Sequence, residues 1–263
     1  MSAATRFTHA VVRVPGESVA NGLRAGSGAD PDPARFAAHH AAYTRALKEA
    51  GLAVVELRPL ENFPDATFVE DTALCLPQGA ILMRPGAPSR MGEVAGIAPT
   101  LRDLYGDVRS IETGHVEGGD ILVTAREVLV GRSARTDAAG IETLSPILAE
   151  WGHGLREVET PPEILHFKTD CGLLDEETVL ATPRLAATRC FDGYRVIETA
   201  SGEEASANCV RVNETVLFPA GFPQTAERLR DAGYTLAELP NGEAAKIDGG
   251  MSCLSLRFTP PRG

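Results

Sequence analysis

Asp120-Ile-Leu-Val, followed closely by Val128-Leu-Val-Gly, is the stretch that decides the fold, because its pattern recurs along the chain. A polar residue precedes a short apolar strand and a turn, and an apolar pair lies roughly 8–10 residues further on, as in a β-hairpin. Further copies begin at Asp71, Asp170 and Asn208, and a half-copy, Asp248-Gly-Gly-Met-Ser-Cys-Leu-Ser-Leu-Arg-Phe, lies near the C-terminus. We expect the partner strand of the half-copy in His9-Ala-Val-Val-Arg-Val-Pro, so that the two chain ends share one unit.

Between the hairpins the spacing of apolar residues changes to that of helices. Asp32-Pro33 predicts the start of a helix that Gly51 ends. Helical spacing also predicts helices over 90–105 and 141–151, the latter kinked at Pro146, and shorter helices near 184–191 and 224–232. Each helix precedes a short extended run, namely Ala53–Leu57, Val108–Ile111, Arg156–Val158, Arg195–Ile197 and Tyr234–Leu239.

The chain thus consists of five units of the hairpin–helix–strand type. One such unit cannot bury both faces of its sheet, and stacking the units around an axis buries them all. The predicted fold class is α/β: a five-fold pseudo-symmetric α/β propeller of ββαβ units, closed by pairing of the N- and C-terminal segments. We expect one domain over residues 1–263. An open α/β sheet wound in sequence order is the rival layout.

Composition excludes several classes of protein. The chain has 263 residues, which is too long for a disulfide miniprotein. Hydrophobic residues make up 43% of it, which is too many for a disordered chain. Its formal charge of -11 disfavours nucleic acid and suits a cationic small molecule. The five cysteines form no Cys-x-x-Cys pair, and neither a secretory signal nor a membrane-spanning run is evident. A reducing, cytoplasmic location is predicted.

Polar residues at matching points of the repeat should meet at one mouth of the central axis, because equivalent positions in a closed repeat share one radius. The set comprises one thiol, one imidazole and four carboxylates: Cys253, His166, Asp65, Glu70, Asp71 and Glu117. Carboxylates in a cup match a flat guanidinium. A thiolate can attack the guanidinium carbon if that carbon is held in line, and a histidine can protonate the departing amine and then assist water.

Four motifs carry a resemblance to a known family. They are Phe63-Pro-Asp-Ala-Thr-Phe-Val-Glu-Asp, Gly114-His-Val-Glu-Gly-Gly-Asp-Ile, Leu165-His-Phe-Lys-Thr and Ile247-Asp-Gly-Gly-Met-Ser-Cys-Leu-Ser-Leu-Arg-Phe. In this order the chain, from about Phe7 to Phe258, resembles the dimethylarginine dimethylaminohydrolases of the guanidine-modifying superfamily. The resemblance implies a five-fold α/β propeller. It also implies hydrolysis of Nω-methylated L-arginine to L-citrulline and a methylamine, without a metal or an organic cofactor.

The resemblance also implies roles for individual residues. Cys253 would be the nucleophile and His166 the general acid and base. Glu117 would orient His166 and hold the substrate. The implied substrate contacts are Asp71 backed by Glu70 for the guanidinium, Asp65 for the α-ammonium, Arg90 and Arg135 for the carboxylate, Leu23 as the lid residue, and Ile247. The predicted partner is this small molecule, with a homodimer as an open option.

Other interpretations of the same residues stay open. Arginine deiminases carry a guanidinium-binding Asp two residues after the catalytic His, where this chain has Lys168, which disfavours plain arginine. The rivals are a deiminase-like enzyme that releases ammonia from arginine and a sensor module that binds arginine without turnover. Cys253 and His166 as metal ligands are a third alternative, disfavoured because no close-spaced ligand pair accompanies them.

Most of the remaining chemistry-bearing residues are assigned to packing or to solvent. The glycine-rich stretch 21–28 is expected to be a flexible loop over the pocket. A rim position is considered for His115. The residues expected to be structural or solvated are Cys75, Cys171, Cys190, Cys209, His9, His39, His40, His153, Asp120 and Asp248.

Overall fold

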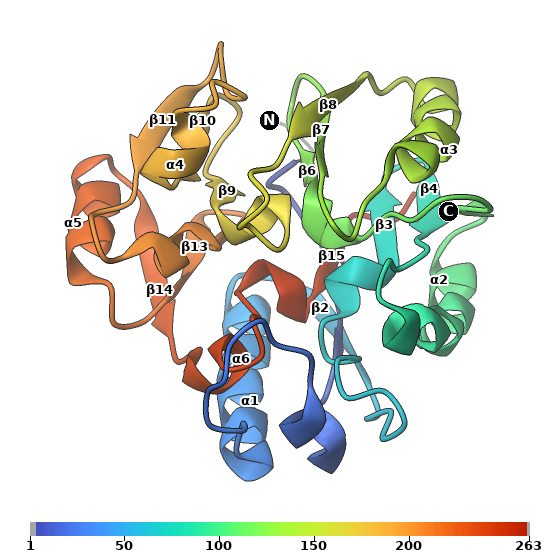
Figure 1. Ribbon diagram of the computed structural model, residues 1–263, viewed down its shortest axis with the longest axis horizontal. Coiled ribbons are helices and arrows are strands. Elements are labelled where there is room, and N and C mark those ends of the chain that lie inside the picture. Colours follow the sequence, from blue (N-terminus) through green and yellow to red (C-terminus); the bar gives the residue numbers. More distant parts are fainter. Residues whose placement is uncertain (1–3, 262–263) are drawn as a thin grey trace.

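The computed structural model describes residues 4–261, which form five separate three-stranded sheets arranged around a central axis (Figure 1). In four of the sheets an antiparallel hairpin is followed by a third strand parallel to its central strand. The helices lie at the outer edge of the ring. This arrangement confirms the predicted propeller and excludes the open wound sheet.

The strands of four sheets run in chain order. They are β3 (Ala73–Leu76), β4 (Gly79–Leu82) and β5 (Val108–Ser110); β6 (Ile121–Val123), β7 (Val128–Arg132) and β8 (Leu155–Glu159); β9 (Cys171–Leu173), β10 (Thr178–Ala181) and β11 (Arg195–Glu198); and β12 (Val210–Val212), β13 (Thr215–Pro219) and β14 (Thr235–Leu239). All four hairpins lie where the repeat predicts them.

The fifth sheet closes the ring. β1 (His9–Arg13) pairs in parallel with β2 (Ala53–Leu57) and antiparallel with β15 (Leu256–Phe258), with Ala10 opposite Arg257. The two ends of the described chain therefore share one unit, as predicted. Because β15 follows Cys253 by only a few residues, closure also determines where that thiol lies.

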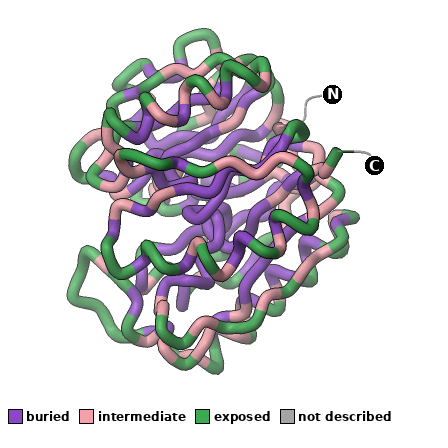
Figure 2. Tube along the Cα trace, turned by 90° about the vertical axis from the view of Figure 1, so that its right-hand side faces the viewer, coloured by how far each residue is buried: buried purple, intermediate pink, exposed green. Residues whose placement is uncertain are grey.

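Five hydrophobic clusters fill the spaces between adjacent sheets. The space between the sheet of β3–β5 and the sheet of β6–β8, for example, contains Ile81 of β4, Val130 of β7 and Leu144 of a flanking helix. The other four clusters likewise combine strands of two neighbouring sheets with at least one helix. Successive side chains of a strand point to opposite faces, so each central strand contributes to two clusters and reads as a continuous apolar run. Figure 2 shows buried chain through the middle and exposed residues mainly at the outside.

The helices agree with the sequence in place but not always in length. They are α1 (Pro33–Glu49), α2 (Ala98–Leu104), α3 (Ala138–Glu150), α4 (Pro183–Ala186), α5 (Pro223–Asp231) and α6 (Gly242–Ala245). Asp32 caps α1 by accepting a hydrogen bond from the Arg35 amide, as Asp32-Pro33 predicts. Pro146 lies inside α3. No helix among residues 4–261 has the length and apolarity needed to cross a membrane.

Two helix predictions need correction. The helix expected over 90–105 is a 3₁₀ segment, η3 (Pro88–Gly96), followed by α2, and glycines at 92 and 96 with Pro99 explain why one α-helix does not run through. Bulky neighbours demand these glycines, since a Cβ at Gly92 would lie 2.3 Å from the Phe63 ring. The helix expected near 184–191 is only α4, and α6 was not predicted.

Gly118 allows the first and second units to approach, and this contact generates a test. A Cβ at residue 118 would lie 2.0 Å from the carbonyl oxygen of Glu70, so Gly118→Ala forces two backbone segments apart. We expect a loss of about 1–3 kcal/mol in unfolding free energy, the usual cost of overpacking, measured by urea denaturation. Gly106→Ala is the control, because nothing lies within 4 Å of its added Cβ. Equal stability of the two variants would contradict this close approach.

Candidate active site

Five 3₁₀ turns surround the axis, each just before the first strand of a hairpin or before β15. They are η2 (Val69–Thr72), η4 (Gly118–Asp120), η5 (Phe167–Thr169), η6 (Glu204–Ala207) and η7 (Ser252–Leu254). Contacts link η7 to η2, η2 to η4, η4 to η5 and η5 to η6. Each turn contains or adjoins one polar side chain of interest: Asp71, Glu117, His166, Asn208 and Cys253. The repeat thereby gathers side chains from all five units.

A cavity of about 190 Å³ lies at one end of this ring. Most of the predicted site residues line it: Leu23, Asp65, Asp71, Arg90, Arg135, His166, Ile247 and Cys253. Glu117 lies directly behind His166. Within the described chain, the structure therefore brings together every predicted site residue except Glu70.

Cys253 is a buried thiol in the middle of η7. Its sulfur accepts a hydrogen bond from the Gly250 amide at 3.4 Å and one from the Asn208 side-chain amide at 3.8 Å. Burial, together with the negative charges of Glu70 and Asp71, raises the pKa of Cys253 to about 12. Without a bound cation the residue is therefore a neutral thiol at neutral pH.

His166 and Glu117 form a buried ion pair, with 2.6 Å between His166 Nε2 and Glu117 Oε2. Burial alone would lower the pKa of His166, but the carboxylates of Asp71, Glu117 and Asp120 raise it to about 9. Burial would likewise raise the pKa of Glu117, but the hydrogen bond and charge of His166 and the guanidinium of Arg90 hold it low. Backbone amides of Gly86 and Ala87 also donate to Glu117. The imidazole is thus protonated and able to act as an acid.

Arg90 lies behind Asp71, and its donors are already engaged. It pairs with Asp71 at 2.5 Å and with Glu93 at 2.8 Å, and it donates to the carbonyl oxygens of Asp65 and Phe68. Only 4% of its side chain is exposed. The expected grip on a substrate carboxylate is therefore not visible for Arg90, whose main contacts are with its own acids. Arg135 is more available, 17% exposed and 3.3 Å from Glu117.

The glycine-rich stretch covers the cavity as expected. The backbone amide of Leu23 donates to Asp65 Oδ1 at 2.9 Å, and the amide of Ala25 donates to Asp248 Oδ2 at 2.7 Å. The Leu23 side chain is 39% exposed, whereas both carboxylates lie in the cavity wall. Asp248, expected to be structural, holds this loop through that contact. Its φ of 58° lies in the left-handed region, in which Asp is enriched among the residues other than glycine.

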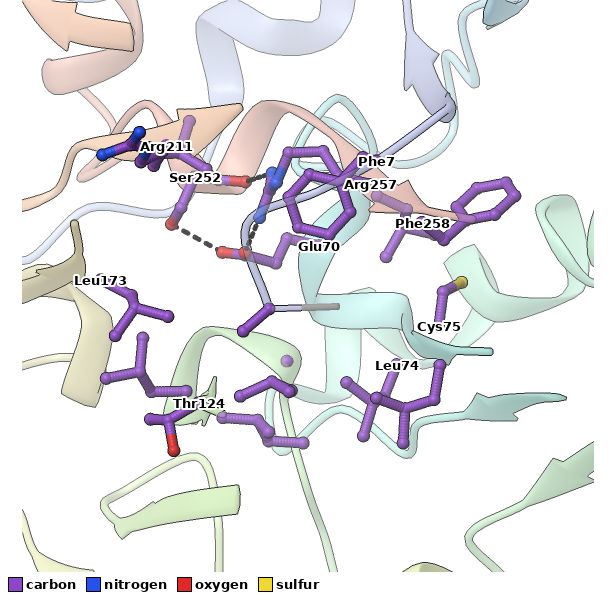
Figure 3. Close-up of a pocket in the computed structure, with 18 of the residues that line it drawn as sticks. Phe7, Glu70, Leu74, Cys75, Thr124, Leu173, Arg211, Ser252, Arg257 and Phe258 are labelled. Atoms are coloured by element: carbon purple, nitrogen blue, oxygen red, sulfur yellow. Dashed lines mark hydrogen bonds and ion pairs between the residues drawn. The ribbon is translucent and has the colours of Figure 1, made fainter. Parts of the chain in front are cut away.

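Glu70 faces away from the cavity of Cys253. It lies in a second cavity of about 640 Å³, where Figure 3 shows it between Ser252 and Arg257. Ser252 Oγ donates to it at 2.7 Å, and Lys168 Nζ lies 2.6 Å away. Glu70 therefore contacts Ser252, the neighbour of the nucleophile, and does not support Asp71 as expected. Lys168 also lines this second cavity and does not line the cavity of Cys253.

Asp71, Glu117 and His166 meet one geometric requirement of a metal site. One potential ligand atom from each lies within 4.8 Å of the others. These atoms already have partners: Asp71 pairs with Arg90 and accepts a hydrogen bond from the Gly119 amide, while Glu117 pairs with His166. Cys253 is not in this group. The group therefore differs from the metal site of Cys253 and His166 that is considered above as an alternative.

The other expected structural residues behave largely as such. Asp120 accepts hydrogen bonds from the Phe167 amide and from Ser133, which holds the backbone beside His166. His40 is buried on α1. His115 pairs with Asp137 and is absent from the cavity wall. Sequence reasoning missed Asn208 as a contact of the nucleophile, although its place at the head of the fourth hairpin copy was the available signal.

Comparison with known proteins places this geometry in context. Residues 55–218 match the family model described as arginine deiminase. The chain is 40% identical to the N(G),N(G)-dimethylarginine dimethylaminohydrolase of Pseudomonas aeruginosa, over 96% of its own length and all of the relative. It is 33% identical to the enzyme of the same name from Streptomyces coelicolor, over 82% of its own length. A structure of the Pseudomonas enzyme, a cysteine-to-serine mutant complexed with citrulline, superimposes with a TM-score of 0.94 over 96% of this chain and all of that one, at 39% identity.

The ion pair of His166 and Glu117 predicts a pH-dependent stability. The pKa of His166 is raised from 6.5 to about 9, so its contribution is complete below pH 6.5 and is lost as the pH rises through about 9. The whole contribution amounts to up to about 3 kcal/mol. Glu117→Gln removes the charge of the hydrogen-bonded partner of His166, and we expect a flatter decline of the unfolding free energy between pH 6.5 and 9, measured by urea denaturation. His153→Gln should keep the wild-type slope, and identical slopes for all three proteins would refute the pairing.

Proposed function

Because the chain belongs to the dimethylarginine dimethylaminohydrolase family, we propose that it hydrolyses Nω-methylated L-arginine through a covalent intermediate on Cys253. The substrates are asymmetric dimethylarginine and monomethylarginine, and the products are L-citrulline and dimethylamine or methylamine. One observation carries the proposal: a small buried cavity contains a thiol, a protonated imidazole and carboxylates from several units. That charge pattern suits a guanidinium cation.

The cavity supports a specific orientation of the substrate. Asp71 would face the guanidinium, with Glu117 behind His166. Asp65 would face the α-ammonium, and Leu23 and Ile247 would contact the substrate at the mouth. Arg135 would bind the carboxylate. Arg90 would add positive charge nearby, since binding the substrate directly requires it to release Asp71 or Glu93. The lid loop would then close over the amino-acid end of the substrate.

A bound guanidinium would activate the nucleophile. The thiol is neutral because burial and nearby carboxylates disfavour a thiolate. A cation placed between Asp71 and the sulfur reverses that balance, so the substrate itself would lower the pKa of Cys253. As the substrate binds, the thiol proton of Cys253 passes to solvent. The thiolate then attacks the guanidinium carbon, and a carbon–sulfur bond forms. Protonated His166 donates its proton to the methylated nitrogen, whose bond to carbon breaks as the amine leaves.

The second half-reaction regenerates the thiol group. His166, neutral after the first step, would accept a proton from a water molecule as that water attacks the thiouronium carbon. The carbon–sulfur bond breaks and sulfur leaves as the thiolate. The remaining hydroxyl proton is lost as L-citrulline forms and returns to the sulfur, which regenerates the thiol. Glu117 would keep the imidazole oriented throughout, because its 2.6 Å contact holds Nε2. The chain's own residues are sufficient for both steps, and no metal or organic cofactor is assigned a role.

The position of Lys168 supports a methylated substrate over arginine. The second guanidinium-binding Asp of arginine deiminases would occupy this position, but here a lysine points into the other cavity. No carboxylate from residue 168 would then hold the substituted nitrogen. The alternative is a deiminase-like enzyme acting on free arginine. We also propose that the chain acts as one catalytic domain in the cytoplasm, which suits its five free cysteines, while a homodimer stays a prediction.

The products decide between these substrates. We expect purified protein incubated with asymmetric dimethylarginine to release citrulline and dimethylamine in equal amounts, and to release little ammonia from L-arginine. Citrulline, dimethylamine and ammonia should be assayed separately. Cys253→Ser should lower turnover by more than about 1,000-fold because it removes the nucleophile, while retaining substrate binding by calorimetry. Ammonia from arginine as the dominant product would overturn the substrate assignment.

Arg135 should act mainly in binding. A carboxylate is held alike in the ground state and the transition state, so Arg135→Ala should raise KM by about 10–100-fold, the worth of a charged hydrogen bond, with little change in kcat. Arg132→Ala is the matched control, since Arg132 lies three residues away, is 49% exposed and pairs with Glu157. A fall in kcat at unchanged KM would show that Arg135 does not bind the carboxylate.

A further inference from the structure

The fourth unit of the ring is the one to which the proposed mechanism assigns no residue. Its turn, η6, is followed by Asn208, which is buried and precedes β12. The matching positions of the first three copies hold Asp71, Asp120 and Asp170, all carboxylates. An amide thus replaces an acid at the one position of the four that contacts the nucleophile.

Asn208 uses both ends of its amide on η7. Its Nδ2 donates to Cys253 Sγ at 3.8 Å, and its Oδ1 accepts a hydrogen bond from the Ser252 amide at 2.9 Å. These two bonds determine the orientation of the amide, because a flipped side chain would set two donors against each other and aim an oxygen at the sulfur. Ser252 is also held from its other side by Glu70 (Figure 3). The nitrogen is therefore directed at the reacting sulfur.

Gly250 is needed for this approach. A Cβ at residue 250 would lie 2.1–2.5 Å from the terminal atoms of the Asn208 side chain. The same glycine donates its amide to Cys253 Sγ at 3.4 Å. Two neutral N–H donors, one from the backbone and one from a side chain, thus converge on the sulfur.

We propose that Asn208 is a further catalytic residue, which stabilises the thiolate of Cys253 through its side-chain amide together with the Gly250 N–H. The thiolate must form in a cavity walled by carboxylates, and hydrogen bonds from fixed neutral donors favour the charged form of an acid. A carboxylate at residue 208 would instead repel the developing charge. The contribution to turnover rests on the proposed function, whereas the effect on the thiolate does not.

The charges around the sulfur show why a neutral donor matters. Glu70 and Asp71 raise the pKa of Cys253, and Lys168 lowers it from the far side. A further carboxylate at residue 208 would also raise the pKa of Cys253. An arginine or lysine at residue 208 would compete with the guanidinium for the same acids. An amide donates without altering the charge that the cavity presents to a cation.

Two variants of similar shape separate this role from a structural one. Asn208→Asp keeps an acceptor for the Ser252 amide but removes the donor and adds a charge. Asn208→Leu keeps the branching but removes both the donor and the acceptor. Gln224→Glu is the control for converting an amide to an acid, at an exposed residue of α5. The readout is the rate of iodoacetamide alkylation at pH 8 of the peptide containing Cys253, by mass spectrometry, because only the thiolate reacts.

We expect the alkylation rate to fall in the order wild type, Asn208→Leu, Asn208→Asp. The Asp variant should be at least about 10-fold slower than wild type, equivalent to one pKa unit, and Gln224→Glu should be unchanged. If the role of Asn208 is only structural, the order of alkylation rates of the two variants is reversed, because Asn208→Leu loses the hydrogen bond to the Ser252 amide that Asn208→Asp keeps. That reversed order, or an Asp variant within twofold of wild type, would overturn the proposal. Urea denaturation of each variant verifies that the compared proteins are folded.

Turnover provides the second readout. With methylated arginine, both variants should lose kcat more than they raise KM, in the same order as the alkylation rates. Alkylation uses no substrate, so it separates the two proposals. If the protein does not hydrolyse methylated arginine but the alkylation order holds, the proposed function fails while the role of Asn208 stands. If hydrolysis occurs and the order is reversed, only the role of Asn208 fails.

Discussion

Pairing of β1 with β15 is the constraint on which the rest of the structure depends. It joins strands from opposite ends of the chain, with His9 opposite Phe258, and closes a ring that four complete units leave open. Each space between sheets is filled by residues of two neighbours, so an unclosed ring would leave two apolar faces in water. Closure also brings η7, and with it Cys253, between the first and fourth units. The same contact therefore completes the core and places the nucleophile.

The site depends on a balance of buried charges. Arg90 is shared between Asp71 and Glu93, and Glu117 is matched by His166. Removing one partner from such a set leaves an unpaired buried charge, which costs several kcal/mol, so these pairs preserve the geometry of the cavity. Asp65 and Asp71 nevertheless lie in the wall with the thiol. The balance explains how one cavity can keep Cys253 protonated when empty and favour its ionisation when a guanidinium enters.

Several residues had structural positions that their sequence neighbourhood did not reveal. Asp71 and Glu70 are adjacent in the chain, but η2 directs them into different cavities, so motif position alone could not separate their roles. Arg90 matches a carboxylate-binding position, yet it is engaged by Glu93 three residues later. Asp248 was expected to be structural as a turn-capping carboxylate, and no local pattern shows that the lid loop reaches it. In each case the role of the residue depends on a contact across the fold or on the direction of its side chain.

The sequence by itself determined the number and order of the units, the closure of the ring, the family and most residues of the cavity. These follow from local periodicity and from motifs, which depend on neighbours in the chain. Only the tertiary structure decided the direction of Glu70, the engagement of Arg90 and the contact of Asn208 with the nucleophile. Those features depend on how turns from different units face each other around the axis. Hydrogen-bond direction at such contacts is set by packing between distant segments, and a linear pattern does not encode it.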